Sequence, residues 1–229
     1  MTGTVTEKPS WHLIKSHKRV LIGTSAVILL PVIVGLILWA RLPDSIAIHF
    51  DAQSQPDEWG SKPLAVFGIP AWILAMHWLA VVATCTDRRN QGIPPQLLRL
   101  LLWMCPTLSV VLCILTYANA LGATVNIGIP IMLYMGVLFL FMGNYMPKCK
   151  PNRSVGIRVR WTMTDGENWR RTHRLAGWSM SIGGLLILLT ACLCLPWLFF
   201  SILAAALLVP FLYSFLYHLQ SARQTGRGK

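Results

Sequence analysis

Two polar stretches of this chain carry the side chains that could take part in chemistry. The first runs over Arg41–Pro63, where His49, Asp51 and Asp57 place an imidazole near two carboxylates. These groups suit a ligand-binding face, an acid–base pair or a metal site, although one His with two carboxylates is a weak signal for a metal. They equally suit a compact cap in which His49 pairs with a nearby carboxylate, and the sequence leaves these alternatives open.

The second stretch runs over Gly143–Gly177 and is strongly basic. It holds eight of the twenty Lys and Arg residues of the chain, and Trp residues lie in and beside it. A guanidinium group binds phosphate or carboxylate through two parallel hydrogen bonds. Arg158, Arg171 and Arg174 therefore predict a basic pocket for phosphate or lipid headgroups, whereas His173 among the arginines is a candidate acid–base group. A simpler interpretation of the whole stretch is an anchor for anionic lipid.

The motifs of common enzymes are absent from the sequence. It contains no GxSxG, HExxH or phosphate-binding loop, and its six cysteines form no CxxC pair that would indicate zinc. No Asp or Glu lies deep in an apolar segment, which argues against a transporter coupled to protons or sodium. His77, the ionisable residue near the middle of a predicted span, is interpreted as a neutral hydrogen-bonding residue between helices, with a functional role as the alternative. We therefore expect no enzyme activity, cofactor or metal.

Apolar residues dominate the chain and fall into blocks. Of the 229 residues, 55% are hydrophobic and only 12% are charged, about half the charged fraction of a soluble domain. Each block has about twenty residues, the length that crosses a bilayer core of ~30 Å. The sequence predicts an all-α polytopic membrane protein with six transmembrane helices, at Val20–Ala40, Leu64–Cys85, Leu97–Ala118, Ile127–Met146, Leu175–Leu195 and Trp197–Leu219.

The basic residues predict the orientation of these helices. Eighteen of the twenty Lys and Arg residues fall in the N-tail, alternate loops and the C-tail, and only Arg41 and Lys62 fall on the opposite side. Because Lys and Arg collect at the cytoplasmic ends of helices, both termini are predicted to be cytoplasmic, and the net charge of +12 is assigned to anionic lipid rather than nucleic acid. The predicted segments are a cytoplasmic N-tail 1–19, a transmembrane domain 20–219 with an outer loop 41–63 and a cytoplasmic basic loop 147–174, and a cytoplasmic C-tail 220–229.

Local patterns predict some order in the outer loop. Residues 46–51 alternate between apolar and polar, which predicts a short strand with His49 and Asp51 on its polar face. The residues Gln55–Asp57 favour a turn after it.

Local patterns also predict structure in the basic segment. Pro147 and Pro151 end the fourth span, and residues 156–161 alternate and predict an extended stretch. Thr164–Glu167 has the form of a capping box and predicts the start of a new helix. With Trp169, His173 and Ala176 on one side and arginines on the others, such a helix is expected to lie in the membrane interface.

Both polar stretches resemble motifs of the SdpI family, bacterial membrane proteins that give immunity to a secreted sporulation-delaying toxin and act in its signalling. The outer stretch has the pattern LPxxIxxHF followed by PDxW and SK, over Leu42–Lys62. The basic stretch has GNYMPKxKPN, GIRxxWT and THRLxG in that order, over Gly143–Gly177. The chain departs from the family at Asp51, Ser54 and Arg160, where Asn, Gly and Pro are usual.

The resemblance implies a multi-pass protein of the bacterial cell membrane that protects against a secreted, membrane-active peptide toxin. The implied partners are the peptide toxin at the outer face, a cytoplasmic transcriptional repressor and anionic membrane lipids. The motifs implicate the following outer-loop residues in recognition: His49, Phe50, Asp57, Trp59 and Lys62. They implicate the following residues of the basic segment in function: Asn144, Pro147, Lys150, Asn152, Gly156, Arg158, Trp161, Trp169, His173 and Arg174. The alternative is a membrane-embedded enzyme or transporter that acts on a lipid or peptide substrate.

Overall fold

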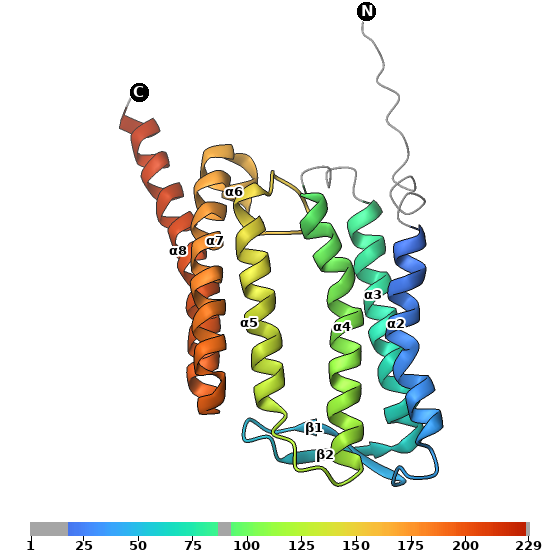
Figure 1. The fold of residues 1–229 in the computed structure, drawn as a ribbon. Helices are drawn as coiled ribbons and strands as arrows, with labels where there is room; N and C mark the ends of the chain where they lie inside the picture. Colours follow the sequence, from blue (N-terminus) through green and yellow to red (C-terminus); the bar gives the residue numbers. More distant parts are fainter. Residues whose placement is uncertain (1–17, 87–92, 228–229) are drawn as a thin grey trace, which may run out of the picture.

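Six long helices run side by side through the computed structural model, which describes residues 18–86 and 93–227. Each is long and apolar enough to cross a membrane: α2 (Lys18–Ile37), a π-helical turn (Leu64–Gly68) continued by α3 (Ile69–Thr86), α4 (Pro95–Ala120), α5 (Gly128–Tyr145), α7 (Gly166–Thr190) and α8 (Pro196–Arg227). The hairpin of β1 (Ser45–Phe50) and β2 (Pro56–Ser61) lies at one end, and the segment between α5 and α7 lies at the other (Figure 1). The prediction of six membrane-spanning helices is confirmed.

The arrangement of Figure 1 places the two polar stretches at opposite ends of the bundle. This agrees with the sequence, in which nearly all Lys and Arg residues fall on one side of the predicted spans. Four of the residues that favoured a cytoplasmic N-tail and loop, namely Lys8, Lys15, Arg88 and Arg89, lie outside the described residues. Which end faces the cytoplasm therefore stays a prediction.

Polar side chains join α2 to its neighbours inside the first half of the bundle. The Oγ1 of Thr24 lies 3.1 Å from Nε2 of His77 on α3, and both side chains are buried. On α4, the Ser109 hydroxyl donates to the Ile28 carbonyl at 3.0 Å and the Tyr117 hydroxyl to the Pro31 carbonyl at 3.1 Å. In an apolar surrounding each such group needs a partner. The prediction that His77 hydrogen-bonds between helices is confirmed.

Glycine lets α5 and α7 pack closely in the second half of the bundle. A β-carbon at Gly143 would lie 2.8 Å from the carbonyl oxygen of Gly177, and one at Gly177 would lie 2.9 Å from that of Gly143. Gly136 and Gly184 meet in the same reciprocal way, two turns further along the helices. Small residues are the usual means by which membrane helices gain van der Waals contact, because lipid offers no hydrophobic driving force.

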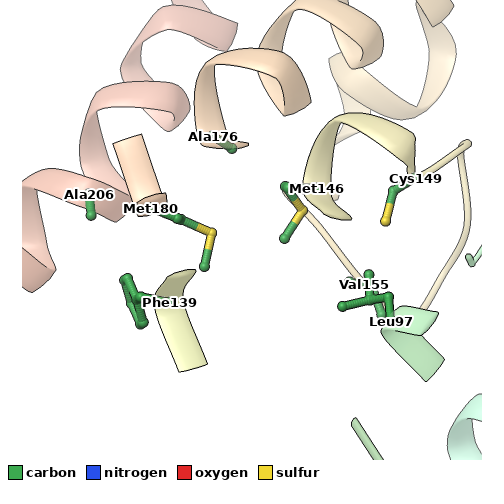
Figure 2. Close-up of a cluster of buried hydrophobic side chains, with 8 residues drawn as sticks. All are labelled: Leu97, Phe139, Met146, Cys149, Val155, Ala176, Met180 and Ala206. Atoms are coloured by element: carbon green, nitrogen blue, oxygen red, sulfur yellow. The ribbon is translucent and has the colours of Figure 1, made fainter. Parts of the chain in front are cut away.

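A cluster of apolar side chains fills the end of the bundle beneath the basic segment. It draws on α4, α5, α7, α8 and the loop between α5 and α7. Its buried members are Leu97, Phe139, Met146, Cys149, Val155, Ala176, Met180 and Ala206 (Figure 2). Because Cys149 and Val155 come from the loop itself, the loop is packed into the bundle rather than laid on a lipid surface.

The prediction of a separate interfacial helix in the basic segment is wrong. Residues 166–174 form the first turns of α7, which continues without a break into the fifth span. Trp169, His173 and Ala176 face the interior of the protein and are buried there. The arginines interleaved with them occupy the opposite face, so the stretch looks surface-bound in sequence although one side of it is core.

Two smaller predictions in the same segment are also wrong. The extended stretch predicted over residues 156–161 ends at Val159, because a short helix, α6 (Arg160–Thr164), begins there. The N-cap of α7 is Asp165 rather than Thr164: its Oδ1 accepts hydrogen bonds from the backbone amides of Glu167 and Asn168 at 2.9 and 3.1 Å. An Asp cap also places a negative charge at the positive end of the helix dipole.

Candidate functional site

The outer polar stretch folds as an antiparallel hairpin. Residue pairs in register include Ser45 with Ser61, Ala47 with Trp59 and His49 with Glu58. The predicted strand is confirmed, whereas the second strand, at residues 56–61, was missed because Pro56 and Gly60 break the alternating pattern. The turn spans residues 51–55, so it begins four residues before the predicted turn at Gln55–Asp57 and overlaps it only at Gln55.

Asp51 and Ser54 shape this turn. The Oδ1 of Asp51 accepts hydrogen bonds from the backbone amides of Gln53 and Gln55, at 2.9 and 2.8 Å. Ser54 has a φ of +63°, in the region that glycine adopts most easily, and this explains why glycine is usual there in the SdpI family. Its hydroxyl compensates by donating to Asn126 Oδ1 at 3.1 Å and accepting from the Gly128 amide at 3.0 Å. The hairpin is thereby tied to the start of α5.

His49 and Asp57 form a close pair across the hairpin. The Nδ1 of His49 lies 2.6 Å from Oδ1 of Asp57, and the side chains are 63% and 45% exposed. The hydrogen bond and the charge of Asp57 raise the pKa of His49 above its ordinary value. Asp51 is engaged with the turn instead, and the described residues contain no cluster of three His, Cys, Asp or Glu that could hold a metal. The predicted pairing of His49 is confirmed, and a three-ligand metal site is not formed.

Lys62 and Trp59 occupy different environments. The side chain of Lys62 is only 12% exposed, and its Nζ lies 3.0 Å from Asp44 and donates to the Trp39 carbonyl at 3.3 Å. It also lies 5.4 Å from the centre of the Trp39 ring. Lys62 therefore fixes the base of the hairpin to the end of α2. Trp59, by contrast, is 57% exposed on the hairpin surface.

A groove of about 380 Å³ separates the hairpin from the nearest ends of α5 and α8. Its polar lining residues are His49, Asp51 and Ser54, and the rest of its lining is mostly apolar. The apolar lining comes from Phe50, Ile127, Ile131, Met132, Pro196, Phe199 and Phe200. A groove lined by both charged and aromatic side chains suits an amphipathic ligand.

At the opposite end of the bundle, Asn152 shapes the loop after α5. It is fully buried, donates from Nδ2 to the Lys150 carbonyl at 2.9 Å and accepts at Oδ1 from the amides of Ser154 and Val155. Three residues before Asn152, the backbone carbonyl of Cys149 accepts a hydrogen bond from the indole N–H of Trp169 at 2.8 Å. Burial raises the pKa of the Cys149 thiol to about 11, so this cysteine is a packing residue rather than a nucleophile.

His173 fixes the next part of the loop. Its ring stacks on Trp169 with centroids 3.8 Å apart, its Nδ1 lies 2.9 Å from the Trp169 carbonyl, and its Nε2 accepts the Ile157 amide at 3.2 Å. Because a carbonyl accepts at one ring nitrogen and an amide donates at the other, the ring is neutral with its proton on Nδ1. Gly156, with a φ of +110°, lies against the Nε2 edge of the ring. A fully buried imidazole bonded at both nitrogens has no atom left for acid–base chemistry.

Trp161 links the loop to the last helix. Its indole N–H donates to the Ser214 hydroxyl at 3.1 Å, and its ring stacks on His218 with centroids 5.7 Å apart. Thr162 closes the loop from the other side by donating to the Ile157 carbonyl at 2.7 Å. The motif residues Asn152, Trp161, Trp169 and His173 thus each hold part of the loop by a hydrogen bond, and Gly156 packs against His173.

The remaining predicted residues of the basic segment lie on its surface. Exposed side chains include Asn144, Pro147, Lys150, Arg158 and Arg174. The predicted pocket of arginines is formed in part: Arg171 and Arg174 line a common groove, whereas Arg158 is not among its residues. The basic segment is therefore a rigid support that presents cations at one end of the bundle.

Sequence reasoning missed several polar residues that hold the two ends together. Asn168 donates from Nδ2 to the Ser214 carbonyl at 3.0 Å and accepts from Thr172 at 2.9 Å, and all three residues are buried. The spacing of Asn168 and Thr172, one helical turn apart, was the available signal. Asn126 was missed because nothing in a short uncharged loop marks a residue that contacts both the hairpin and Cys194.

The fold and these two ends define a multi-pass helical membrane protein with a hairpin at one surface and a folded basic loop at the other. Residues 148–214 match the SdpI/YfhL protein family, and residues 26–74 match a domain of unknown function (DUF1648). The chain is 27% identical over 165 residues to the immunity protein SdpI of Bacillus subtilis (strain 168), covering 70% of this chain and 76% of that protein. No solved structure matches. The resemblance to the SdpI family is confirmed, and with it a multi-pass protein of the bacterial membrane.

Proposed function

We propose that this protein is a membrane immunity protein that protects the cell from a secreted, membrane-active peptide by capturing it at the outer hairpin. Its similarity to the immunity protein SdpI supports the class of function. The proposed capture of the peptide rests on the groove of about 380 Å³ between the hairpin and the ends of α5 and α8. A membrane-active peptide is amphipathic, and the groove offers aromatic side chains next to charged ones.

The chemistry of the outer loop favours a cationic, apolar ligand. The loop has four carboxylates against two basic residues, and Lys62 is already engaged with Asp44. Trp59 and Phe200 offer exposed aromatic surface, which tends to dominate the energy of an interface. A peptide that arrives from outside reaches this loop first if the predicted orientation holds.

Survival of toxin-sensitive bacteria that produce each variant tests this function. Asp57→Asn and Trp59→Ala are expected to abolish protection against a sporulation-delaying toxin while the amount of protein in the membrane stays normal. Asp57 acts on the groove through its partner His49, which lines it, and Trp59 is exposed on the hairpin itself. Trp72→Ala is the matched control, because Trp72 is an exposed Trp on α3 and not on the hairpin. Full protection by Asp57→Asn and Trp59→Ala at normal abundance would leave the hairpin as a structural cap.

The alternative of an enzyme is tested by the fate of the peptide. Capture predicts that a toxin incubated with the purified protein is recovered intact by mass spectrometry. A cleaved or modified peptide would favour an enzyme. The geometry of His173 supports capture, because its ring nitrogens are both occupied by backbone groups.

We also propose that the basic end captures a cytoplasmic transcriptional repressor. The motif residues of the basic segment fall into two groups, which supports this proposal. The buried ones fix the loop, whereas Lys150 and Arg158 are exposed and have no side-chain partner among the described residues. A planar guanidinium recognises a carboxylate by its shape as well as by its charge. Arg158→Lys is therefore expected to reduce co-sedimentation of the repressor with membranes although the charge is kept. Unchanged co-sedimentation in both Arg158→Lys and Arg158→Ala would exclude this contact.

A further inference from the structure

A second basic feature lies outside the folded loop, on the surface between α7 and α8. Three arginines and two aromatic residues line an open groove of about 440 Å³ there. The residues of this groove, called here the arginine groove, are Arg170, Arg171, Arg174, Leu175, Trp178 and Tyr213. Neither the hairpin nor the scaffold of His173 contributes to it.

Two of its arginines are held in place by neighbours. Both oxygens of Glu167 bond Arg170, at 2.8 Å to Nε and 2.7 Å to Nη2, and Oε1 also bonds the Nε of Arg171 at 2.6 Å. Arg171 lies 5.3 Å from the centre of the Tyr217 ring, and Tyr213 lines the groove with it. One carboxylate thus orients two guanidinium groups and leaves several of their N–H donors directed elsewhere.

Arg174 gives the groove its uncompensated charge. Its side chain is exposed and has no ion-pair partner among the described residues. With Glu167 included, the three arginines carry a net charge of about +2 at neutral pH. The groove therefore suits a ligand with one or two phosphate groups, since planar donors match phosphate oxygens in pairs.

The surface next to the groove identifies the source of the phosphate. Trp178 is 64% exposed and lies one helical turn, about 6 Å, further into the predicted span than Arg174. Ile182, Leu185 and Leu189 continue the same face of α7 and are all at least half exposed. Along α7, the arginines therefore lie at the headgroup level, Trp178 lies at the interface and the apolar face lies below it. This order matches the phosphate headgroup, the interfacial region and the acyl chains of a phospholipid.

From this succession we infer that the arginine groove binds the phosphate headgroup of one anionic phospholipid, whose acyl chains lie along the apolar face of α7. The site differs from general attraction between a basic protein and an acidic membrane, because it needs particular side chains. It also differs from the peptide and repressor contacts, which use other residues.

Native mass spectrometry of the full chain, delipidated in a non-ionic detergent and titrated with phosphatidylglycerol, tests this inference. Arg174→Gln is expected to weaken binding of the lipid about tenfold, the equivalent of one lost charge-assisted contact. Arg160→Gln, which removes the same charge from an exposed position at the same end, is expected to bind as the unmodified protein does. Equal losses in the two variants would show diffuse attraction and overturn the inference.

Two further arms separate a lipid from a free phosphate. Trp178→Leu is expected to weaken phosphatidylglycerol binding while it leaves the thermal stability of the detergent-solubilised protein unchanged, because the side chain is exposed. Phosphatidylcholine is expected to bind more weakly than phosphatidylglycerol. Displacement of bound phosphatidylglycerol by millimolar inorganic phosphate, or equal affinity for the two lipids, would contradict a site for an anionic lipid.

Discussion

Gly156 lies so close to the imidazole of His173 that any side chain at residue 156 would collide with Nε2. The same Nε2 accepts a hydrogen bond from the amide of Ile157, so the backbone of the loop packs against this edge of the ring. Two residues that the family motif places seventeen positions apart are thus a single contact in space. The contact explains why the loop needs a glycine here, beyond its φ of +110°.

Substitution of three glycines separates the collision from the backbone strain. Gly122→Ala places a side chain at a φ of +90° with open space around it and is expected to cost about 1–3 kcal/mol. Gly156→Ala adds the collision with His173 and is expected to cost more than this range. Gly166→Ala meets neither obstacle, because its β-carbon has no atom within 4 Å, and is expected to be close to neutral. Thermal unfolding midpoints measured in detergent rank the three variants by stability. An equal effect of Gly156→Ala and Gly122→Ala would contradict a collision between residue 156 and His173.

The His49–Asp57 pair predicts a pH-dependent hairpin. The pKa of His49 is raised in the folded protein, so the pair contributes stability that is fully present below pH 6.5 and is lost as the pH rises through the folded value. In Asp57→Asn the pKa of His49 is expected to fall back towards 6.5. NMR titration of labelled histidine in nanodiscs measures this shift, with His49→Gln identifying the signal.

A matched variant gives the control for that titration. Glu58→Gln removes one carboxylate from the same strand, and the charge of Glu58 raises the pKa of His49 less than the hydrogen bond to Asp57 does. It is therefore expected to lower the pKa of His49 less than Asp57→Asn does. If both variants lower it equally, general acidity of the loop rather than the short hydrogen bond controls His49.

Ser54 predicts effects of different size for two small substitutions. Ser54→Ala keeps the strained φ of +63° and loses the hydrogen bonds to Asn126 and Gly128, so it is expected to loosen the hairpin. Ser54→Gly loses the same bonds but relieves about 1 kcal/mol of backbone strain. Hydrogen exchange at the Gly128 amide is expected to be faster in Ser54→Ala than in Ser54→Gly. The reverse order would show that the strain at residue 54 is negligible.

Much of the fold follows from the sequence because each transmembrane helix is a nearly continuous apolar block. Lipid requires every backbone group to be satisfied within the segment, so an apolar block of this length has few alternatives to a helix. The hairpin was predicted only in half, since Pro56 and Gly60 hide the alternation of β2. The second strand, β2, can be recognised only from its pairing with β1 in the structure.

The start of α7 could not be predicted for a different reason. Arg170, Arg171 and Arg174 make residues 166–174 look like a surface segment, while Asn168 and Trp169 directly before them are buried. Burial of these polar atoms depends on acceptors at Ser214 and Cys149, which are distant in the chain. No local pattern encodes such partners.

The role of Lys62 at the outer site likewise could not be predicted from local sequence. A lysine in an outer loop is normally solvated, and here it packs over Trp39 and pairs with Asp44. The motif that contains it is therefore partly a folding motif. Recognition residues and positioning residues share one sequence pattern, and only the contacts distinguish them.

The opposite placement of the hairpin and the basic segment predicts how each is labelled in cells (Figure 1). In a background without the six native cysteines, Gln53→Cys lies at the exposed turn of the hairpin and Arg160→Cys at the exposed start of α6. The excess of Lys and Arg beside the basic segment predicts that its end is cytoplasmic. A membrane-impermeant maleimide is therefore expected to modify Gln53→Cys in intact cells and Arg160→Cys only after the membrane is permeabilised. Because the two ends are separated by the full length of the helices, equal labelling of both in intact cells is incompatible with a transmembrane bundle. Labelling of Arg160→Cys alone would reverse the orientation and remove the hairpin from the path of a peptide that arrives from outside.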